Sequence, residues 1–127
     1  DYLAAYQRVD IALDPFPYTG GTTTMEALWM GVPVVTLAGE RFLSRQGVGL
    51  LANAELNDWI ASTDADYVEI ARSQSSDLRS LGELRAHLRE QVLGSPMFDA
   101  PRFAQHFGNA LRDIWRIWCN QSTNRAT

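Results

Sequence analysis

Lysine is absent from this chain of 127 residues, so all eleven of its basic side chains are arginine. The formal net charge of -4 argues against a basic surface that binds nucleic acid broadly. The single cysteine, Cys119, excludes an internal disulfide and favours a reducing, cytoplasmic setting. No apolar run approaches the roughly 20 residues of a membrane span, and no secretory leader is recognisable.

What is present indicates a folded domain. Hydrophobic residues make up 46% of the chain and charged residues 20%, a globular rather than a disordered composition. The chain begins at Asp1 without a methionine, in a segment (1–8) that is typical of the end of a helix. We therefore expect it to be a piece of a longer protein.

A strand, a helix and a second strand follow one another closely near the start of the chain. The apolar run 9–13 predicts a strand buried on both faces, and residues 23–30 predict a helix with one apolar face. Gly31 stands where a helix C-cap glycine belongs, Pro33 prevents continuation, and residues 34–37 form the next strand. This spacing predicts a right-handed βαβ unit in a parallel sheet, and hence an α/β fold.

The remainder of the chain is predominantly helical in pattern. We predict a helix over 44–54, a short element at 58–60, and helices from Thr63 onward. Two capping boxes are expected, Thr63-x-x-Asp66 and Ser80-x-x-Glu83. The second would begin a helix whose apolar stripe is Leu81, Leu84, Leu88 and Val92.

The last helix carries a broad apolar face for so short a chain. Asp99 is expected to cap it, with Pro101 in its first turn. We expect the face to pack on a part of the protein outside this chain. Its members are Phe103, Phe107, Ala110, Leu111, Ile114, Trp115 and Trp118.

The turn between the first strand and the first helix is the main candidate site. Gly20 and Gly21 permit positive φ and close approach of a ligand, and the helix then opens with Thr22 and Thr23. Free amides and the positive end of a helix meet at such a turn, which favours a bound phosphate. The alternative is a strand-to-helix turn with a threonine cap and no ligand. Arg45 could assist with a phosphate.

Two acidic residues near the turn admit more than one role. Glu26 could close a capping box with Thr23, or it could accept hydrogen bonds from a ribose diol, as acidic residues do in dinucleotide sites. Sequence pattern alone favours the cap. Asp14 could orient the turn or cap it, and we favour a structural role.

The other polar residues give weaker signals. His87 and His106 lie on separate predicted helices without ligands at suitable spacing, so neither a metal site nor a histidine triad is expected. Cys119 is expected to pack. A solvated helix face is predicted for Arg72, Arg79, Arg85 and Arg89.

Residues 13–40 resemble the C-terminal catalytic half of the protein O-GlcNAc transferases and the related Spindly proteins, glycosyltransferase family 41. The similar pieces are Val-Asp-Ile-Ala-Leu-Asp (9–14), Pro-Tyr-Thr-Gly-Gly-Thr-Thr-Thr-Met-Glu-Ala-Leu-Trp-Met-Gly-Val-Pro-Val-Val-Thr (17–36), and Gly39-Glu40-x-x-x-Ser44-Arg45. Gly-Ser-Pro-Met-Phe (94–98) and Trp115-x-x-Trp118-Cys119 resemble the family's ending. The similarity covers nearly the whole chain and is strongest over 9–50.

The resemblance implies a GT-B architecture, in which two Rossmann-like domains face a cleft and the C-terminal one binds the donor nucleotide. The family's His-Thr-Thr run at the diphosphate falls on Gly21, Thr22 and Thr23, so a histidine side chain is missing here. Its ribose-binding acid falls on Glu26, which shifts our interpretation of Glu26 toward ribose.

The implied division is 1–60 as part of the nucleotide-sugar-binding Rossmann-like domain, 61–120 as its helical extension, and 121–127 as a frayed tail. The family's diphosphate lysine and the other domain are expected upstream of Asp1, so the isolated fragment should not transfer sugar.

The expected function is donor binding in an inverting glycosyltransferase that acts on protein Ser or Thr hydroxyls. UDP-GlcNAc is the expected donor and GDP-fucose the alternative, with no metal or other cofactor. Gly20, Gly21, Thr22 and Thr23 would hold the diphosphate and Glu26 the ribose, while no residue is a convincing general base. Helical repeats upstream would deliver the acceptor. The rival hypotheses are a non-catalytic interaction module and a GT-B enzyme with a non-protein acceptor.

Overall fold

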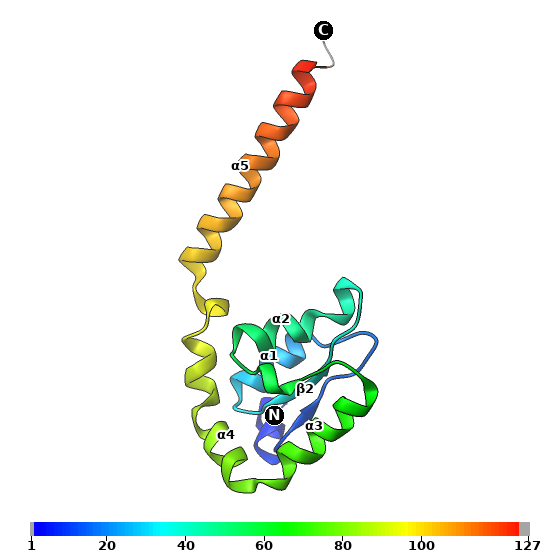
Figure 1. The fold of residues 1–127 in the computed structure, drawn as a ribbon. Coiled ribbons are helices and arrows are strands. Elements are labelled where there is room, and N and C mark those ends of the chain that lie inside the picture. Colours follow the sequence, from blue (N-terminus) through cyan, green and yellow to red (C-terminus); the bar gives the residue numbers. More distant parts are fainter. Residues whose placement is uncertain (1, 125–127) are drawn as a thin grey trace. The chain divides into compact units, whose positions relative to one another are not determined.

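The computed structural model describes residues 2–124, which fall into two units that divide between Met97 and Phe98 (Figure 1). The first unit holds a small sheet with its helices, and the second holds one long helix. In chain order the elements are η1 Leu3–Arg8, β1 Ala12–Leu13, α1 Thr22–Trp29, β2 Val34–Leu37, η2 Phe42–Ser44, α2 Gln46–Asn53, η3 Asn57–Trp59, β3 Ile60–Ala61, α3 Asp64–Ser76, α4 Leu78–Leu93, η4 Pro96–Phe98 and α5 Ala100–Asn124.

The three strands form a parallel sheet in the order β1-β2-β3. Ala12 pairs with Val34 on one side of β2, and Thr36 pairs with Ile60 on the other. The parallel pairing of β1 and β2 around α1 confirms the predicted βαβ unit and the α/β class. The short element predicted at 58–60 covers the last two residues of η3 and the first residue of β3.

The first strand differs from its prediction. It is confined to Ala12–Leu13, and Leu13 is 58% exposed, so the strand expected over 9–13 and buried on both faces was wrong. The reason is its place at the edge of the sheet, where it has one neighbouring strand among the described residues. Apolar composition alone does not distinguish an edge strand from a central one.

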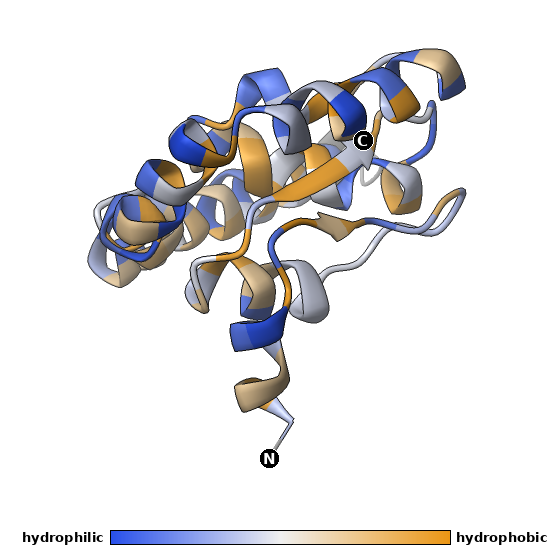
Figure 2. Ribbon diagram, turned by 90° about the horizontal axis from the view of Figure 1, so that it is seen from below, coloured by the Kyte–Doolittle hydropathy of each residue, from blue (hydrophilic) through white to orange (hydrophobic). Residues whose placement is uncertain are grey.

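The central strand β2 forms the middle of the core. Val34, Val35 and Thr36 are buried, and α1, α2 and α3 all contact this strand. Figure 2 shows it as a hydrophobic ribbon among helices that alternate between hydrophobic and hydrophilic residues. The other fully or nearly buried apolar residues are Ala27, Leu28, Val32, Leu51, Ala54, Leu56, Trp59, Ala61, Leu81, Leu88 and Val92.

The end of α1 follows the prediction closely. Gly31 has a φ of +75°, the left-handed conformation that glycine adopts at helix C-termini. A β-carbon at this position would also lie 2.9 Å from the backbone oxygen of Arg85 on α4. Glycine is therefore required here both by conformation and by the close approach of another helix.

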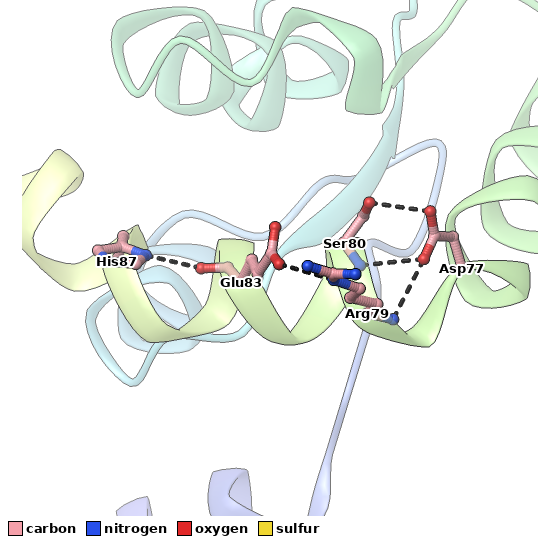
Figure 3. A network of polar contacts seen from close by, with 5 residues as sticks. All are labelled: Asp77, Arg79, Ser80, Glu83 and His87. Carbon is pink, nitrogen blue, oxygen red and sulfur yellow. Dashed lines mark hydrogen bonds and ion pairs between the residues drawn. The ribbon is translucent and has the colours of Figure 1, made fainter.

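The start of α4 corrects a prediction. Ser80 lies inside the helix, and Asp77 is the cap: its Oδ1 accepts from the amides of Arg79 and Ser80 at 3.1 and 3.0 Å (Figure 3). Glu83 pairs with Arg79 at 3.1 Å instead of closing a box. Asp77 precedes Ser80 by three residues, and its carboxylate bonds both amides and the Ser80 hydroxyl, at 2.9 Å. These bonds keep the pKa of Asp77 below its ordinary value, with the Ser80 amide as the main cause.

Other helix predictions hold. Thr63 caps α3 by accepting from the amide of Asp66 at 3.1 Å, as half of the predicted box. On α4, Leu81, Leu88 and Val92 are buried and Leu84 packs against the core, which confirms the predicted stripe.

The arginines are not all on a solvated face. Arg85 is ion-paired with Asp10 and donates to the Gly31 carbonyl oxygen at 3.4 Å. Arg89 is exposed, as predicted, and it also lies over the ring of Trp29, 4.5 Å from its centroid. Where α1 and α4 pack together, Arg89 therefore joins the two helices, while Arg85 joins α4 to Asp10 and to Gly31 just after α1. Arg72 and Arg79 make exposed pairs within their own helices, as a solvated face requires.

The second unit consists mainly of α5. Asp99 accepts from the amide of Arg102 at 3.0 Å, which confirms it as the cap, and Pro101 is in the first turn. Phe103 stacks on Phe107 and Trp115 on Trp118. Of the tail predicted over 121–127, the chain is helical to Asn124 and residues 125–127 lie outside the described part. The predicted boundary at residue 60 stays a prediction. Within 2–124, no helix has the length and apolarity to cross a membrane.

Candidate functional site

The turn before α1 presents a row of unused amide groups. The first bond of the helix runs from the Met25 amide to the Gly21 carbonyl oxygen, at 3.0 Å. The amides of Gly21, Thr22, Thr23 and Thr24 have no acceptor among residues 2–124, and no side chain caps the helix. Unpaired amides at the positive end of a helix form a favourable place for an anion.

Gly20 has a different role from its neighbour. Its amide donates to Asp14 Oδ1 at 2.7 Å, so this N–H is already bonded. A β-carbon on Gly20 would lie 2.6 Å from the hydroxyl oxygens of both Thr23 and Thr24. Among the described glycines only Gly31 has a positive φ, so Gly20 and Gly21 do not use the conformation that glycine permits. Gly20 is needed because there is no room for a side chain.

Gly21 and Thr22 line one side of the site. They border an open, mainly apolar cavity of about 600 Å³, together with Met25, Arg45 and Gln46 among others. The Gln46 Oε1 atom lies 2.9 Å from the position of a β-carbon on Gly21. Arg45 donates to the Gly39 carbonyl oxygen at 2.9 Å, so its guanidinium is held at the edge of this cavity.

Thr23 lies on the other side of the helix start. It borders a smaller cavity of about 220 Å³ with Tyr6, Asp14 and Thr24. The Tyr6 hydroxyl donates to the Thr23 carbonyl oxygen at 3.4 Å. The structure therefore brings the four predicted turn residues to one helix start, but Thr22 and Thr23 border different cavities and Gly20 borders neither.

Glu26 does not form the predicted capping box. Thr23 is the second residue of α1 rather than its cap, and Glu26 Oε2 accepts from the Tyr2 hydroxyl at 3.0 Å. Tyr2 also shares a hydrogen bond with Tyr6 at 3.3 Å; this bond, with the one to Glu26, raises the pKa of Tyr2. The half-exposed carboxylate therefore keeps accepting capacity for a ligand.

Sequence reasoning missed Tyr2 as a neighbour of Glu26. The two residues are 24 positions apart, and the start of the chain was interpreted only as the end of a helix. The available signal was the pair of tyrosines four residues apart, whose rings pack edge to face 5.9 Å apart.

Asp14 is a buried hydrogen-bond centre. Asp14 is only 3% exposed, and its Oδ2 atom accepts a hydrogen bond from the Thr36 hydroxyl at 2.7 Å. Oδ1 accepts from the Gly20 amide and, at 3.5 Å, from the Thr24 hydroxyl. These bonds support the structural role that the sequence favoured for Asp14.

Tyr67 of α3 also contacts Asp14, through the backbone of Asp14. Its hydroxyl donates to the Asp14 carbonyl oxygen at 2.8 Å, and its ring packs edge to face on Phe16. Burial raises the pKa of Tyr67, and the charge of Asp14 raises it further.

The loop after β2 completes this edge of the sheet. Ser44 is buried and folds the loop by bonding the Arg41 amide and carbonyl, while its own carbonyl accepts from Gly39 at 3.0 Å. A cavity of about 410 Å³ lies beside this loop, lined by Phe16, Glu40 and Thr63 among others. Open α/β sheets bind ligands at this carboxyl end of their strands.

The histidines remain apart from these cavities. His87 Nδ1 lies 2.9 Å from the Glu83 carbonyl oxygen on the same helix (Figure 3), and His106 lies on α5 in the other unit. Within the part of the chain that the structure describes, no three His, Cys, Asp or Glu residues are grouped as metal ligands.

The chain is a parallel α/β unit with free helix amides at the carboxyl edge of its sheet, and its likeness to a solved structure identifies it as part of a GT-B glycosyltransferase. It matches a solved structure of a mutant O-GlcNAc transferase from Thermobaculum terrenum with a TM-score of 0.88 and 42% identity. The match covers 96% of this chain and 24% of that one. The predicted fold class is thereby confirmed.

The chain belongs to glycosyltransferase family 41: the family described as "Glycosyl transferase family 41" matches residues 2–107. A Petunia hybrida protein named "Probable UDP-N-acetylglucosamine--peptide N-acetylglucosaminyltransferase SPINDLY" is 42% identical over 120 residues, which is 94% of this chain. A Caenorhabditis elegans UDP-N-acetylglucosamine--peptide N-acetylglucosaminyltransferase is 30% identical over 110 residues, or 87% of this chain.

The resemblance to O-GlcNAc transferases and Spindly proteins is therefore confirmed. The chain spans only 13% of the length of the Petunia relative and 10% of the Caenorhabditis one.

Proposed function

We propose that this chain is the donor-binding part of an inverting glycosyltransferase, which moves GlcNAc from a nucleotide sugar to Ser or Thr hydroxyls of proteins. The observation that carries the proposal is the set of free amides from Gly21 to Thr24, on a chain of family 41. Relatives named as UDP-N-acetylglucosamine--peptide N-acetylglucosaminyltransferases support both the donor and the protein acceptor.

In this proposal the helix start holds the diphosphate of the donor. Negative charge grows on the leaving nucleotide as the sugar departs, and amides already aimed at that oxygen stabilise it without reorganisation. Gly21, Thr22 and Thr23 supply the amides, the exposed hydroxyls of Thr22 and Thr23 add further donors, and Gly20 shapes the turn. Because backbone amides supply the positive end, binding needs no metal ion or other cofactor.

Glu26 binds the ribose of the same nucleotide. A carboxylate accepts hydrogen bonds only, and a ribose diol offers two donors. The proposal is supported by the absence of a capping role, because the carboxylate's one bond among the described residues is to the exposed Tyr2. Tyr2 and a ribose can both donate to the same carboxylate.

The parts that this chain lacks belong to the rest of the protein. A general base and the second domain of the cleft would come from other segments, so the isolated fragment should be inactive. The apolar face of α5 would pack on the preceding catalytic domain, and upstream helical repeats would deliver the acceptor. A single cysteine supports a cytoplasmic location.

Calorimetric titration of a full-length protein containing this chain tests the proposal. We expect UDP to bind more tightly than GDP, with the same Kd in EDTA. Tighter binding of GDP would indicate that the donor is a guanine nucleotide sugar such as GDP-fucose rather than UDP-GlcNAc. Failure of both nucleotides to bind would favour the alternative hypothesis of a non-catalytic interaction module. Transfer of sugar to a non-protein acceptor would contradict the proposed protein acceptor.

Glu26→Ala provides the residue-level test. We expect the donor KM to rise by on the order of tenfold or more, since a lost bond to a charged group costs about 1.5–3 kcal/mol. The melting temperature should change little. Tyr2→Phe is the matched control, because it removes the same Tyr2–Glu26 bond but keeps the carboxylate. Equal effects of the two variants would contradict a direct ribose contact.

A further inference from the structure

We propose that Asp14 is a positioning residue for the donor site: its buried carboxylate fixes the Gly20–Gly21 turn and so aims the free amides of α1. The inference rests on the proposed function, because it assigns to Asp14 a role in nucleotide affinity. Asp14 itself makes no contact with the donor in this proposal.

The first step is the bond between Asp14 and the turn. The Gly20 amide donates to Oδ1 at 2.7 Å, one residue before the row of unused amides begins. The Thr24 hydroxyl, one turn into the helix, approaches the same oxygen at 3.5 Å. One carboxylate oxygen therefore holds the chain on both sides of Gly21, Thr22 and Thr23.

The second step is the anchoring of the carboxylate itself. Oδ2 accepts from the Thr36 hydroxyl of the central strand at 2.7 Å, and the Asp14 amide donates to the Val35 carbonyl oxygen at 2.9 Å. The Asp14 carbonyl accepts from Tyr67 of α3 at 2.8 Å. The residue is thus tied to β2 and α3 while it holds the turn.

The third step concerns the space around the carboxylate. A β-carbon on Gly47, in the first turn of α2, would lie 2.4 Å from Oδ2. The first turn of α2 is thus packed directly against Asp14, as Gly20 and Thr24 are at the start of α1.

These contacts separate the two oxygens by role. Oδ1 positions the turn, whereas Oδ2 joins the carboxylate to the sheet. An asparagine can keep both bonds, because its oxygen accepts from Gly20 and its amide can donate to the Thr36 hydroxyl. An alanine leaves the Gly20 amide without a partner and releases the turn.

The experiment compares UDP affinity and melting temperature in a full-length protein and three variants. Asp14→Ala should weaken UDP binding by on the order of tenfold or more, because small displacements of positioned groups are costly. Asp14→Asn should restore Kd to within about twofold of the wild type. Thr36→Val is the matched control: it removes the Oδ2 bond and lowers the melting temperature, but because Oδ1 still accepts from the Gly20 amide it should change Kd far less than Asp14→Ala does.

Each outcome separates the inference from the function on which it rests. Wild-type binding of UDP together with unchanged Kd in Asp14→Ala would overturn only the role of Asp14. An equal loss of affinity in Thr36→Val would also overturn it, since general destabilisation would explain both. If the wild type binds neither UDP nor GDP, the proposed function fails and the inference falls with it. Should Asp14→Ala not fold, Asp14→Ser, which is too short to reach Gly20, replaces it with the same expected Kd.

Discussion

The inner and outer sides of the turn before α1 are built in opposite ways, although they come from one short stretch of sequence. On the inner side, Thr19, Thr24 and Asp14 are buried, and Gly20 leaves no room for a β-carbon. On the outer side, which faces solvent, Thr22 and Thr23 are exposed, although they border different cavities, and their amides are unpaired within residues 2–124. The difference shows that a glycine-threonine motif contains two kinds of residue, those that fix the turn and those left free for a ligand.

The largest expected effect tests how tightly the inner side is packed. Gly47→Ala would place a methyl group 2.4 Å from both Asp14 Oδ2 and Thr36 Oγ1, two buried side chains. We expect it to lower the free energy of unfolding by about 3 kcal/mol, the upper end for overpacking. Gly49→Ala, two residues later in α2, meets no atom within 4 Å and should stabilise the helix by up to about 1 kcal/mol. Urea unfolding measures both, and equal effects would contradict the described packing.

The second comparison is between neighbouring glycines on the two sides. Gly20→Ala brings a β-carbon to 2.6 Å from two threonine hydroxyls, and we expect a loss of about 2 kcal/mol. Gly21→Ala meets only the end of the Gln46 side chain, at 2.9 Å, which can rotate away. Its loss should stay below about 1 kcal/mol, as for a surface change. A greater loss for Gly21→Ala in thermal unfolding would reverse the assignment of the two sides.

The smallest expected effect concerns the outer hydroxyls. Thr22→Val and Thr23→Val should each raise the inhibition constant of UDP by about fivefold, since one hydrogen bond contributes about 1 kcal/mol. Neither should lower the melting temperature, because both residues are exposed. Thr24→Val, on the buried inner side, is the comparison for stability: unlike the two outer variants, it should lower the melting temperature. Unchanged inhibition by UDP in both outer variants would remove the hydroxyls from the site.

Much of the framework could be predicted because it depends on neighbours in sequence. The βαβ unit, the glycine at the end of α1 and the stripe of α4 all follow from short-range periodicity and turn chemistry. The position of the candidate site also followed, since a turn between a parallel strand and a helix lies at the sheet's carboxyl edge. The start of α4 shows the limit of local pattern, because Asp77 and Ser80 are both residue types that cap helices and lie three residues apart. Asp77 is the cap in the structure, where its side chain accepts from two backbone amides.

The division of labour within the site could not be predicted, because contacts distant in sequence determine it. Tyr67 reaches Asp14 across 53 residues, and Thr36 reaches it across 22. Tyr2 meets Glu26 across 24, and no periodic pattern encodes that pair. The different surroundings of the two glycines could not be predicted for the same reason, since only the fold shows that the Gly20 amide bonds Asp14.

The two-residue length of β1 also bears on how this chain behaves at high concentration. The outer edge of β1 has no neighbouring strand within the described residues, and Leu13 is 58% exposed. An unpaired edge strand of this kind can pair with a strand of another molecule. Pro15 follows almost at once and has no amide hydrogen to give. An incoming strand would gain too few bonds to extend, so the exposed border is a poor template for fibrils.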